Sequence, residues 1–138
     1  MTNRYLFVSF SLLIFLKLAA VFLTEFSLYG DEAQYWLWSQ TPDLGYYSKP
    51  PLLAWFLGGY TGLFGSSFAS LKIFPLVVYF FICFAIYVLC LSLSFDKNSS
   101  LLCAISFLVI PAASLSSFII STDLLLLLFW TMAMILVL

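Results

Sequence analysis

Long, nearly uninterrupted runs of apolar residues constrain this chain more than any other feature. A membrane-spanning helix needs about 20 apolar residues to cross a hydrocarbon core of about 30 Å. Runs of this length occupy about residues 5–26 and 71–95, and the first is interrupted by Lys17, whose head must face a partner helix or snorkel. Of the 138 residues, 64% are hydrophobic and 8% are charged, too few to cover a soluble domain. The sequence therefore predicts an all-α integral membrane protein.

Two further membrane spans are predicted in the second half of the chain. The first covers about residues 101–116 after a short polar turn at residues 96–100, and Pro111 is expected to kink or end it. The second runs from about residue 122 to the chain end. Because this run ends at Leu138 with no cap and no polar residue, we expect residues 1–138 to be the N-terminal part of a larger membrane protein. The prediction is about four transmembrane helices.

The composition argues against several classes of function. The net charge of −1 supplies no basic field that would attract nucleic acid. Histidine is absent, which removes the commonest metal ligand and general base. The three cysteines lie inside apolar runs, so we interpret them as small hydrophobic residues rather than a disulfide framework or a zinc site. They are Cys83, Cys90 and Cys103.

Much of the polarity gathers in the loop between the first two spans, about residues 27–68, which contains YGDEAQYWLWSQTPDLGYYSKPPLLAWF. Turn-forming residues divide this loop into two short helices, at about residues 32–40 and 51–65. We expect Asp31 to cap the first helix with Gln34 as its reciprocal partner. Both helices are too short to cross the bilayer and are predicted to lie at its interface.

The charged residues of this loop are predicted to meet. A nine-residue helix travels about 14 Å, whereas the nine residues after it reach back up to about 30 Å, so Lys49 can return beside Asp31 and Glu32. Asp123, which precedes the last span, falls on the same side of the membrane if three spans come before it. This combination suits an anionic, lipid-linked substrate. The lysine would meet its phosphate, and a carboxylate would hold a divalent cation or take a proton from an attacking hydroxyl.

Three sequence runs carry a resemblance to a known family. DEAQYWLWSQTPDLGYYSKPPLLAWF, FGSSFASLKIFP and STDLLLLLFWTMA resemble the dolichyl-phosphate-mannose protein mannosyltransferase superfamily, and the bacterial branch that includes the aminoarabinose transferase acting on lipid A is closest. The resemblance covers the chain from about Leu6 to the end. It implies the membrane domain of a C-fold glycosyltransferase, with the first loop outside the cytoplasm and its two short helices flat on the membrane. In bacteria this places the protein in the inner membrane, with the loop facing the periplasm.

The resemblance also implies an activity and roles for residues. The family transfers a sugar from a polyprenyl-phosphate donor, with inversion at the anomeric carbon, to an acceptor lipid, glycan or protein among the membrane lipids. Asp31 and Glu32 match the catalytic acids, and Asp31 is also a candidate ligand for a divalent metal ion. Lys49 is expected to bind the donor phosphate, and Asp123 to pair with that lysine. The supporting aromatic residues are Tyr35, Tyr46 and Tyr47.

The sequence departs from the family pattern at two positions. Ser48 stands where many members carry the acid of D-H-P-P-L, and Thr122 replaces the proline of T-P-D. Either change could alter the substrate or the use of a metal.

A second function stays open from the residues alone. A small four-helix membrane protein could bind or move a lipid-linked sugar or a small cation without making bonds, with Glu25 as its acid. The long polar loop counts against it, because such proteins usually have short loops.

Overall fold

The computed structural model describes residues 2–23 and 27–138, with side chains from residue 4 onward in these ranges. Every regular element in the described ranges is a helix, which confirms the all-α prediction. The end of the first predicted span, residues 24–26, lies outside the described residues, and so does Glu25. The helices are α1 (Thr2–Leu23), α2 (Gly30–Gln40), α3 (Leu52–Phe64), α4 (Phe68–Ser92), α5 (Lys97–Val109), α6 (Pro111–Ser116) and α7 (Thr122–Val137).

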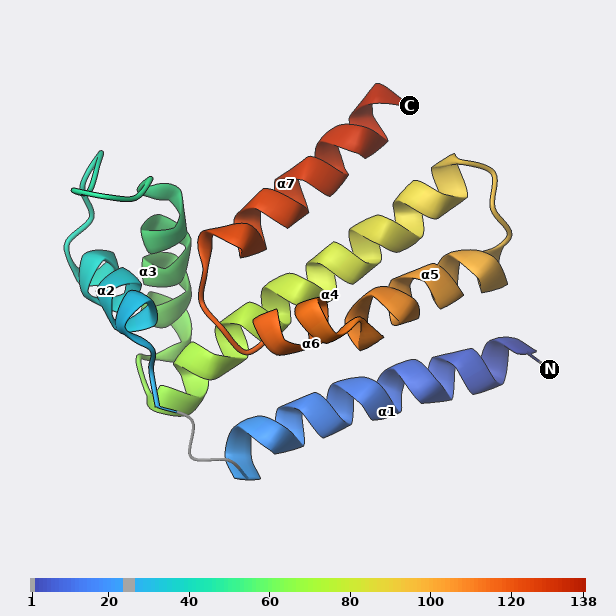
Figure 1. Ribbon diagram of the computed structural model, residues 1–138, viewed down its shortest axis with the longest axis horizontal. Coiled ribbons are helices and arrows are strands. Elements are labelled where there is room, and N and C mark those ends of the chain that lie inside the picture. Colours follow the sequence, from blue (N-terminus) through green and yellow to red (C-terminus); the bar gives the residue numbers. More distant parts are fainter. Residues whose placement is uncertain (1, 24–26) are drawn as a thin grey trace.

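Helix α4 is the centre of the arrangement. It contacts α1, α3, α5 and α7, and Figure 1 shows α1, α5, α4 and α7 running roughly along one direction. Helices α2 and α3 pack on each other and lie across the end where α4 begins, away from both chain termini. The loop with most of the polar residues is therefore gathered at one end of an apolar layer.

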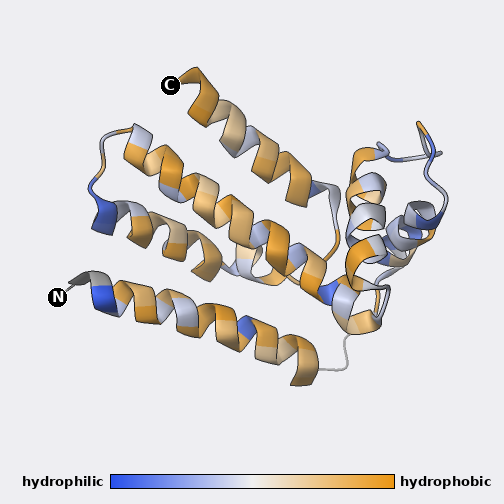
Figure 2. Ribbon diagram, turned by 180° about the vertical axis from the view of Figure 1, so that it is seen from behind, coloured by the Kyte–Doolittle hydropathy of each residue, from blue (hydrophilic) through white to orange (hydrophobic). Residues whose placement is uncertain are grey.

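Within the residues that the structure describes, two helices are long and apolar enough to cross a membrane. They are α1, over Arg4–Leu23, and α4, whereas α3, α5 and α7 are apolar but shorter. Figure 2 shows the apolar colouring along these helices and the polar colouring concentrated on α2 and the loop after it. Phe15 and Phe22 of α1 are 65% and 67% exposed, as expected for side chains that face lipid. The total of about four spans stays a prediction.

Helix α4 begins three residues earlier than the sequence predicted. The hydroxyl of Ser67 accepts a hydrogen bond from the backbone N–H of Ser70 at 3.2 Å and caps the helix. The helix also ends earlier, because Ser94 has a φ of 66°, in the left-handed region that breaks a helix. The helix is displaced toward the N-terminus but keeps the predicted length and apolar character.

The predicted polar turn at residues 96–100 is wrong, because most of it is the first turn of α5. The Asp96 carboxylate accepts hydrogen bonds from the backbone N–H groups of Asn98 at 2.9 Å and Ser99 at 3.2 Å, so it caps a helix that starts at Lys97. The expected break at Pro111 is confirmed, since α5 ends at Val109 and the short α6 begins at that proline.

The close approach of α3 to α2 depends on Gly58. A Cβ atom at this position would lie 2.8 Å from the backbone carbonyl oxygen of Ser39, whereas at Gly59 it would meet nothing within 4 Å. We expect Gly58→Ala to destabilise the protein by about 1–3 kcal/mol, because the backbone of α2 must move to relieve the clash. Gly59→Ala is the matched control and should be neutral or slightly stabilising, since alanine favours a helix. Thermal unfolding in detergent measures both variants, and equal stability would contradict the prediction.

Candidate active site

The N-terminus of α2 is held by Glu32 and not by Asp31. The helix begins at Gly30, and the Glu32 carboxylate accepts a hydrogen bond from the backbone N–H of Tyr29 at 2.9 Å. The prediction that Asp31 caps the helix with Gln34 is therefore wrong, because the helix starts before Asp31. An acid in the first turn still interacts favourably with the helix dipole. The side chain of Asp31 is left exposed toward the loop.

Asp31 and Lys49 form an ion pair, as the loop geometry predicted. The carboxylate oxygen of Asp31 lies 3.7 Å from Nζ of Lys49, and the two side chains are 72% and 33% exposed. An exposed pair of this kind contributes little to stability, about 0–1 kcal/mol. Breaking this ion pair therefore costs little free energy, so that either side chain can bind a ligand instead. A buried pair could not be separated as easily.

The buried ring of Tyr35 lies beneath this ion pair. Nζ of Lys49 is 5.7 Å from the ring centroid of Tyr35, whose side chain is only 2% exposed. The Tyr35 phenol, followed by the Asp31 carboxylate, raises the pKa of Lys49 above its ordinary value of 10.5. The lysine is therefore fully cationic at neutral pH and available to an anion.

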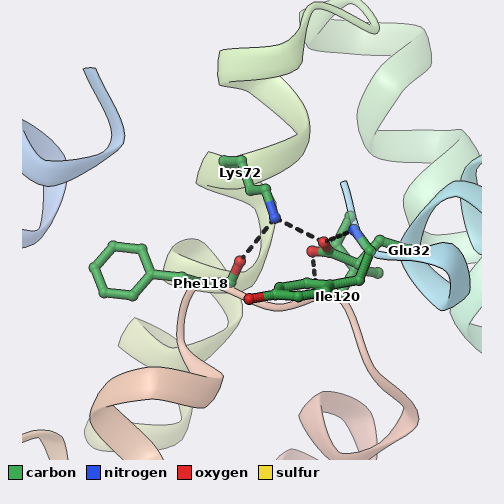
Figure 3. A network of polar contacts seen from close by, with 5 residues as sticks. Glu32, Lys72, Phe118 and Ile120 are labelled. Atoms are coloured by element: carbon green, nitrogen blue, oxygen red, sulfur yellow. Dashed lines mark hydrogen bonds and ion pairs between the residues drawn. The ribbon is translucent and has the colours of Figure 1, made fainter. Parts of the chain in front are cut away.

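Glu32 enters a second ion pair that is completely buried. One of its carboxylate oxygens lies 2.7 Å from Nζ of Lys72 on α4, and the two side chains are 0% and 1% exposed. Its other oxygen accepts a hydrogen bond from the backbone N–H of Ile120 at 2.9 Å. Nζ of Lys72 also donates to the carbonyl oxygen of Phe118 at 3.4 Å, as Figure 3 shows. No role in the site was predicted for Lys72, although it lies in FGSSFASLKIFP, one of the three runs that carry the family resemblance.

Asp123 lies in the first turn of α7 with an exposed side chain. The turn that precedes Asp123 reaches the N-terminus of α2, because the backbone N–H of Ile120 donates a hydrogen bond to the Glu32 carboxylate. This hydrogen bond brings the turn before α7 to the N-terminus of α2, and the meeting of Asp123 itself with Asp31 and Lys49 stays a prediction. The expected ion pair between Asp123 and Lys49 is not formed within the described part of the chain, where Lys49 pairs with Asp31.

Tyr46 and Tyr47 occupy very different environments. The hydroxyl of Tyr46 donates to the carbonyl oxygen of Trp38 at 2.8 Å and accepts from the backbone N–H of Asp43 at 3.2 Å. Its ring stacks on Trp38 with centroids 4.7 Å apart. Tyr46 therefore folds the loop back against α2, whereas the side chain of Tyr47 is fully exposed.

Lys17 faces a partner helix, one of the two alternatives that the sequence allowed. Its Nζ donates to the carbonyl oxygen of Ser114 at 3.1 Å and to the hydroxyl oxygens of Ser114 and Ser117, each at 3.0 Å. The side chain is 7% exposed. This lysine anchors α1 to α6 and the turn that follows it.

Asp31, the candidate metal ligand, has an exposed carboxylate. Both oxygens of Glu32 are engaged by Lys72, Tyr29 and Ile120. Residues 2–23 and 27–138 contain no cluster of three or more His, Cys, Asp or Glu side chains that could hold a metal ion. A divalent cation at this site would thus take Asp31 as a protein ligand and draw other ligands from a bound phosphate, as Mg²⁺ commonly does.

Fold and site together define a helical integral membrane protein with a charged, aromatic site at one end of its apolar helices. The model of the dolichyl-phosphate-mannose-protein mannosyltransferase family matches residues 48–138. The chain therefore belongs to this family of membrane glycosyltransferases.

A curated relative gives a second, shorter match. A segment of 37 residues is 65% identical to the lipid A galacturonosyltransferase RgtD of Rhizobium johnstonii. The match covers 27% of this chain and 8% of that protein, so the chain spans only a small part of its relative. No solved structure matches the chain significantly.

Proposed function

We propose that the protein containing this chain transfers a sugar from a polyprenyl-phosphate donor to an acceptor on the extracytoplasmic side of the membrane, with inversion at the anomeric carbon. The observation that carries the proposal is the exposed ion pair of Asp31 and Lys49, where the polar loop meets the apolar helices. A lipid-linked sugar needs this combination: apolar surface for its chain, a cation for its phosphate and an acid beside the sugar. Membership of the mannosyltransferase family supports the same reaction class.

Lys49 and Asp31 take separate roles in the proposed reaction. The donor phosphate replaces Asp31 as the partner of Lys49, since a loose surface pair costs little to separate. The acceptor hydroxyl oxygen then bonds to the anomeric carbon as the bond from that carbon to the phosphate oxygen breaks. The bonding electrons leave with the polyprenyl phosphate, and Asp31 takes the hydroxyl proton. Attack from the face opposite the leaving group gives inversion.

The acceptor decides what Asp31 has to do. A hydroxyl acceptor needs a base, whereas a phosphate acceptor is already anionic and leaves Asp31 to position the substrate or hold a divalent cation. The name of the relative specifies lipid A as what that protein modifies. We therefore propose a glycolipid as the first acceptor to test, ahead of a glycan or a protein.

The proposed membrane arrangement follows from the same site. α1, α4, the broken pair α5–α6, and α7 each cross the membrane, which places α2, α3 and the turn before α7 on one side. In a bacterium that side is the periplasm and the membrane is the inner membrane. A cysteine introduced at Tyr47, which is fully exposed, should react with an impermeant maleimide added outside the inner membrane. A cysteine at Lys97, the first residue of α5, lies near the C-terminal end of α4 and should be protected from the maleimide.

Reconstitution of the intact protein tests the proposed function. Vesicles containing the purified protein would receive polyprenyl-phosphate sugars of several kinds and a lipid A-type acceptor. We expect transfer of at least one sugar, with NMR of the product showing the inverted anomeric configuration. Movement of the lipid-linked sugar across the bilayer without any new glycosidic bond would overturn the proposal in favour of a transporter.

A further inference from the structure

The buried network around Glu32 joins three segments that are far apart in the sequence. Glu32 belongs to the first turn of α2, Lys72 to the first turns of α4, and Phe118 and Ile120 to the turn between α6 and α7 (Figure 3). The first of these segments carries Asp31 next to Glu32, and the last leads into Asp123. The network therefore joins the two segments that carry the exposed acids Asp31 and Asp123.

The carboxylate of Glu32 is too fully engaged to act on a substrate. It is 0% exposed, one oxygen accepts from Lys72 and the backbone of Tyr29, and the other accepts from the backbone of Ile120. A general base must reach the proton it removes, and a metal ligand must reach the metal. The partners of Glu32 already occupy both oxygens. Its chemistry is that of a fixed anion that orients other groups.

The turn between α6 and α7 depends on side chains for its polar backbone groups. Helix hydrogen bonding is interrupted here, and unpaired backbone groups beside a membrane are costly. Lys72 satisfies the carbonyl of Phe118 and Glu32 the N–H of Ile120, and Lys17 donates to the hydroxyl oxygen of Ser117, the first residue of the turn. Groups from α1, α4 and α2 thus fix this one turn from three sides.

We propose that Lys72 and Glu32 form a positioning pair, which holds the turn before Asp123 against the N-terminus of α2 and so sets the place of Asp123 relative to Asp31 and Lys49. This rests on the proposed function, in which Asp31 and Lys49 act on the substrate, and on the resemblance, which expects Asp123 to lie beside Lys49. Glu32 is then not a catalytic residue, although the sequence motif puts it beside one. A misplacement of about 1 Å in such a site can lower a rate about a hundredfold.

Charge removal distinguishes positioning from catalysis. Lys72→Met alone leaves a buried carboxylate without its partner, and Glu32→Gln alone leaves a buried ammonium, so each should lower both transfer activity and thermal stability in the intact protein. The double variant leaves no unpaired charge, and its amide can still accept from Ile120. We expect it to be more stable and at least about tenfold more active than Lys72→Met alone. Lys97→Met, which removes an exposed lysine, is the matched control.

A distance measurement tests the proposal without relying on activity. Spin labels at cysteines replacing Gln34 on α2 and Leu126 on α7, both exposed, would report the separation of the two segments once the native cysteines are removed. We expect one narrow distance distribution in the parent and the Lys97→Met protein, and a broadened or displaced one in Lys72→Met. If the parent protein transferred no sugar, the proposed function would be wrong. The distance distributions would still test whether Lys72 and Glu32 hold the two segments together.

Two outcomes would overturn the positioning pair. One is an unchanged distance distribution in Lys72→Met protein. The other is a double variant that is no more active, or less stable, than Lys72→Met alone, because a catalytic Glu32 could not be compensated by a second change.

Discussion

Asp31→Asn in the intact protein is expected to lower the rate of sugar transfer about a hundredfold or more, the range in which a general base or a charge-stabilising group acts. The amide keeps the size of the side chain but cannot take the proton of the acceptor hydroxyl or bind a cation strongly. The stability should change little, because the carboxylate is 72% exposed and its ion pair with Lys49 is a loose one at 3.7 Å. Measurement of kcat and thermal unfolding on the same preparation separates the two effects.

Asp43→Asn is the matched control for this variant. Asp43 lies in the same loop with an exposed side chain, and its carboxylate accepts a hydrogen bond from the backbone N–H of Leu44 at 2.6 Å. An asparagine oxygen can still accept that hydrogen bond, so activity should stay close to that of the parent. Equal turnover in Asp31→Asn, Asp43→Asn and parent protein would remove Asp31 from the chemistry.

The local features of the fold were predictable from the sequence. The turn-forming residues Pro42 and Gly45 predicted the separation of the two short helices of the loop. Pro111 predicted the break between α5 and α6, because proline lacks the N–H that continues a helix and its ring clashes with the preceding turn. Errors arose where one polar side chain decides a boundary. Asp96 and Ser67 act as caps, and each starts a helix several residues earlier than the apolar pattern alone indicates.

The site was predictable only in part, because its second ion pair depends on tertiary packing. The meeting of Asp31 and Lys49 follows from chain length within a single loop. Glu32 and Lys72 are separated by 40 positions, and their pairing requires α4 to begin beside α2. The motif therefore identified Glu32 as part of the site, and the catalytic role that it implied differs from the positioning role that we propose. The position of Lys72 within an apolar run indicated that it pairs with a buried acid, since a charge in such a run is rarely left unpaired.

Lys49→Met is expected to weaken use of the donor, with kcat/KM lowered about tenfold to a hundredfold. This range corresponds to the loss of one charge-assisted hydrogen bond, about 1.5–3 kcal/mol. Much of the effect should appear in the KM for the polyprenyl-phosphate sugar, because the lysine meets a phosphate that is charged before and after the reaction. Lys49→Arg keeps the cation and should retain more activity than Lys49→Met. Equal loss in both variants would show that the charge itself is not what the site needs.

The pH dependence provides an independent check on the same lysine. Tyr35 and Asp31 raise the pKa of Lys49 above its ordinary value of 10.5. Lys49 therefore stays cationic at every pH below its raised pKa and loses its charge only as the pH rises through that pKa. Donor KM in the parent should therefore stay level between about pH 7 and 9, where an unperturbed lysine is also protonated. Tyr35→Phe removes the larger of the two influences, so the rise in KM should begin at a lower pH than in the parent. An unchanged alkaline limb in Tyr35→Phe would contradict the influence of Tyr35 on the pKa of Lys49.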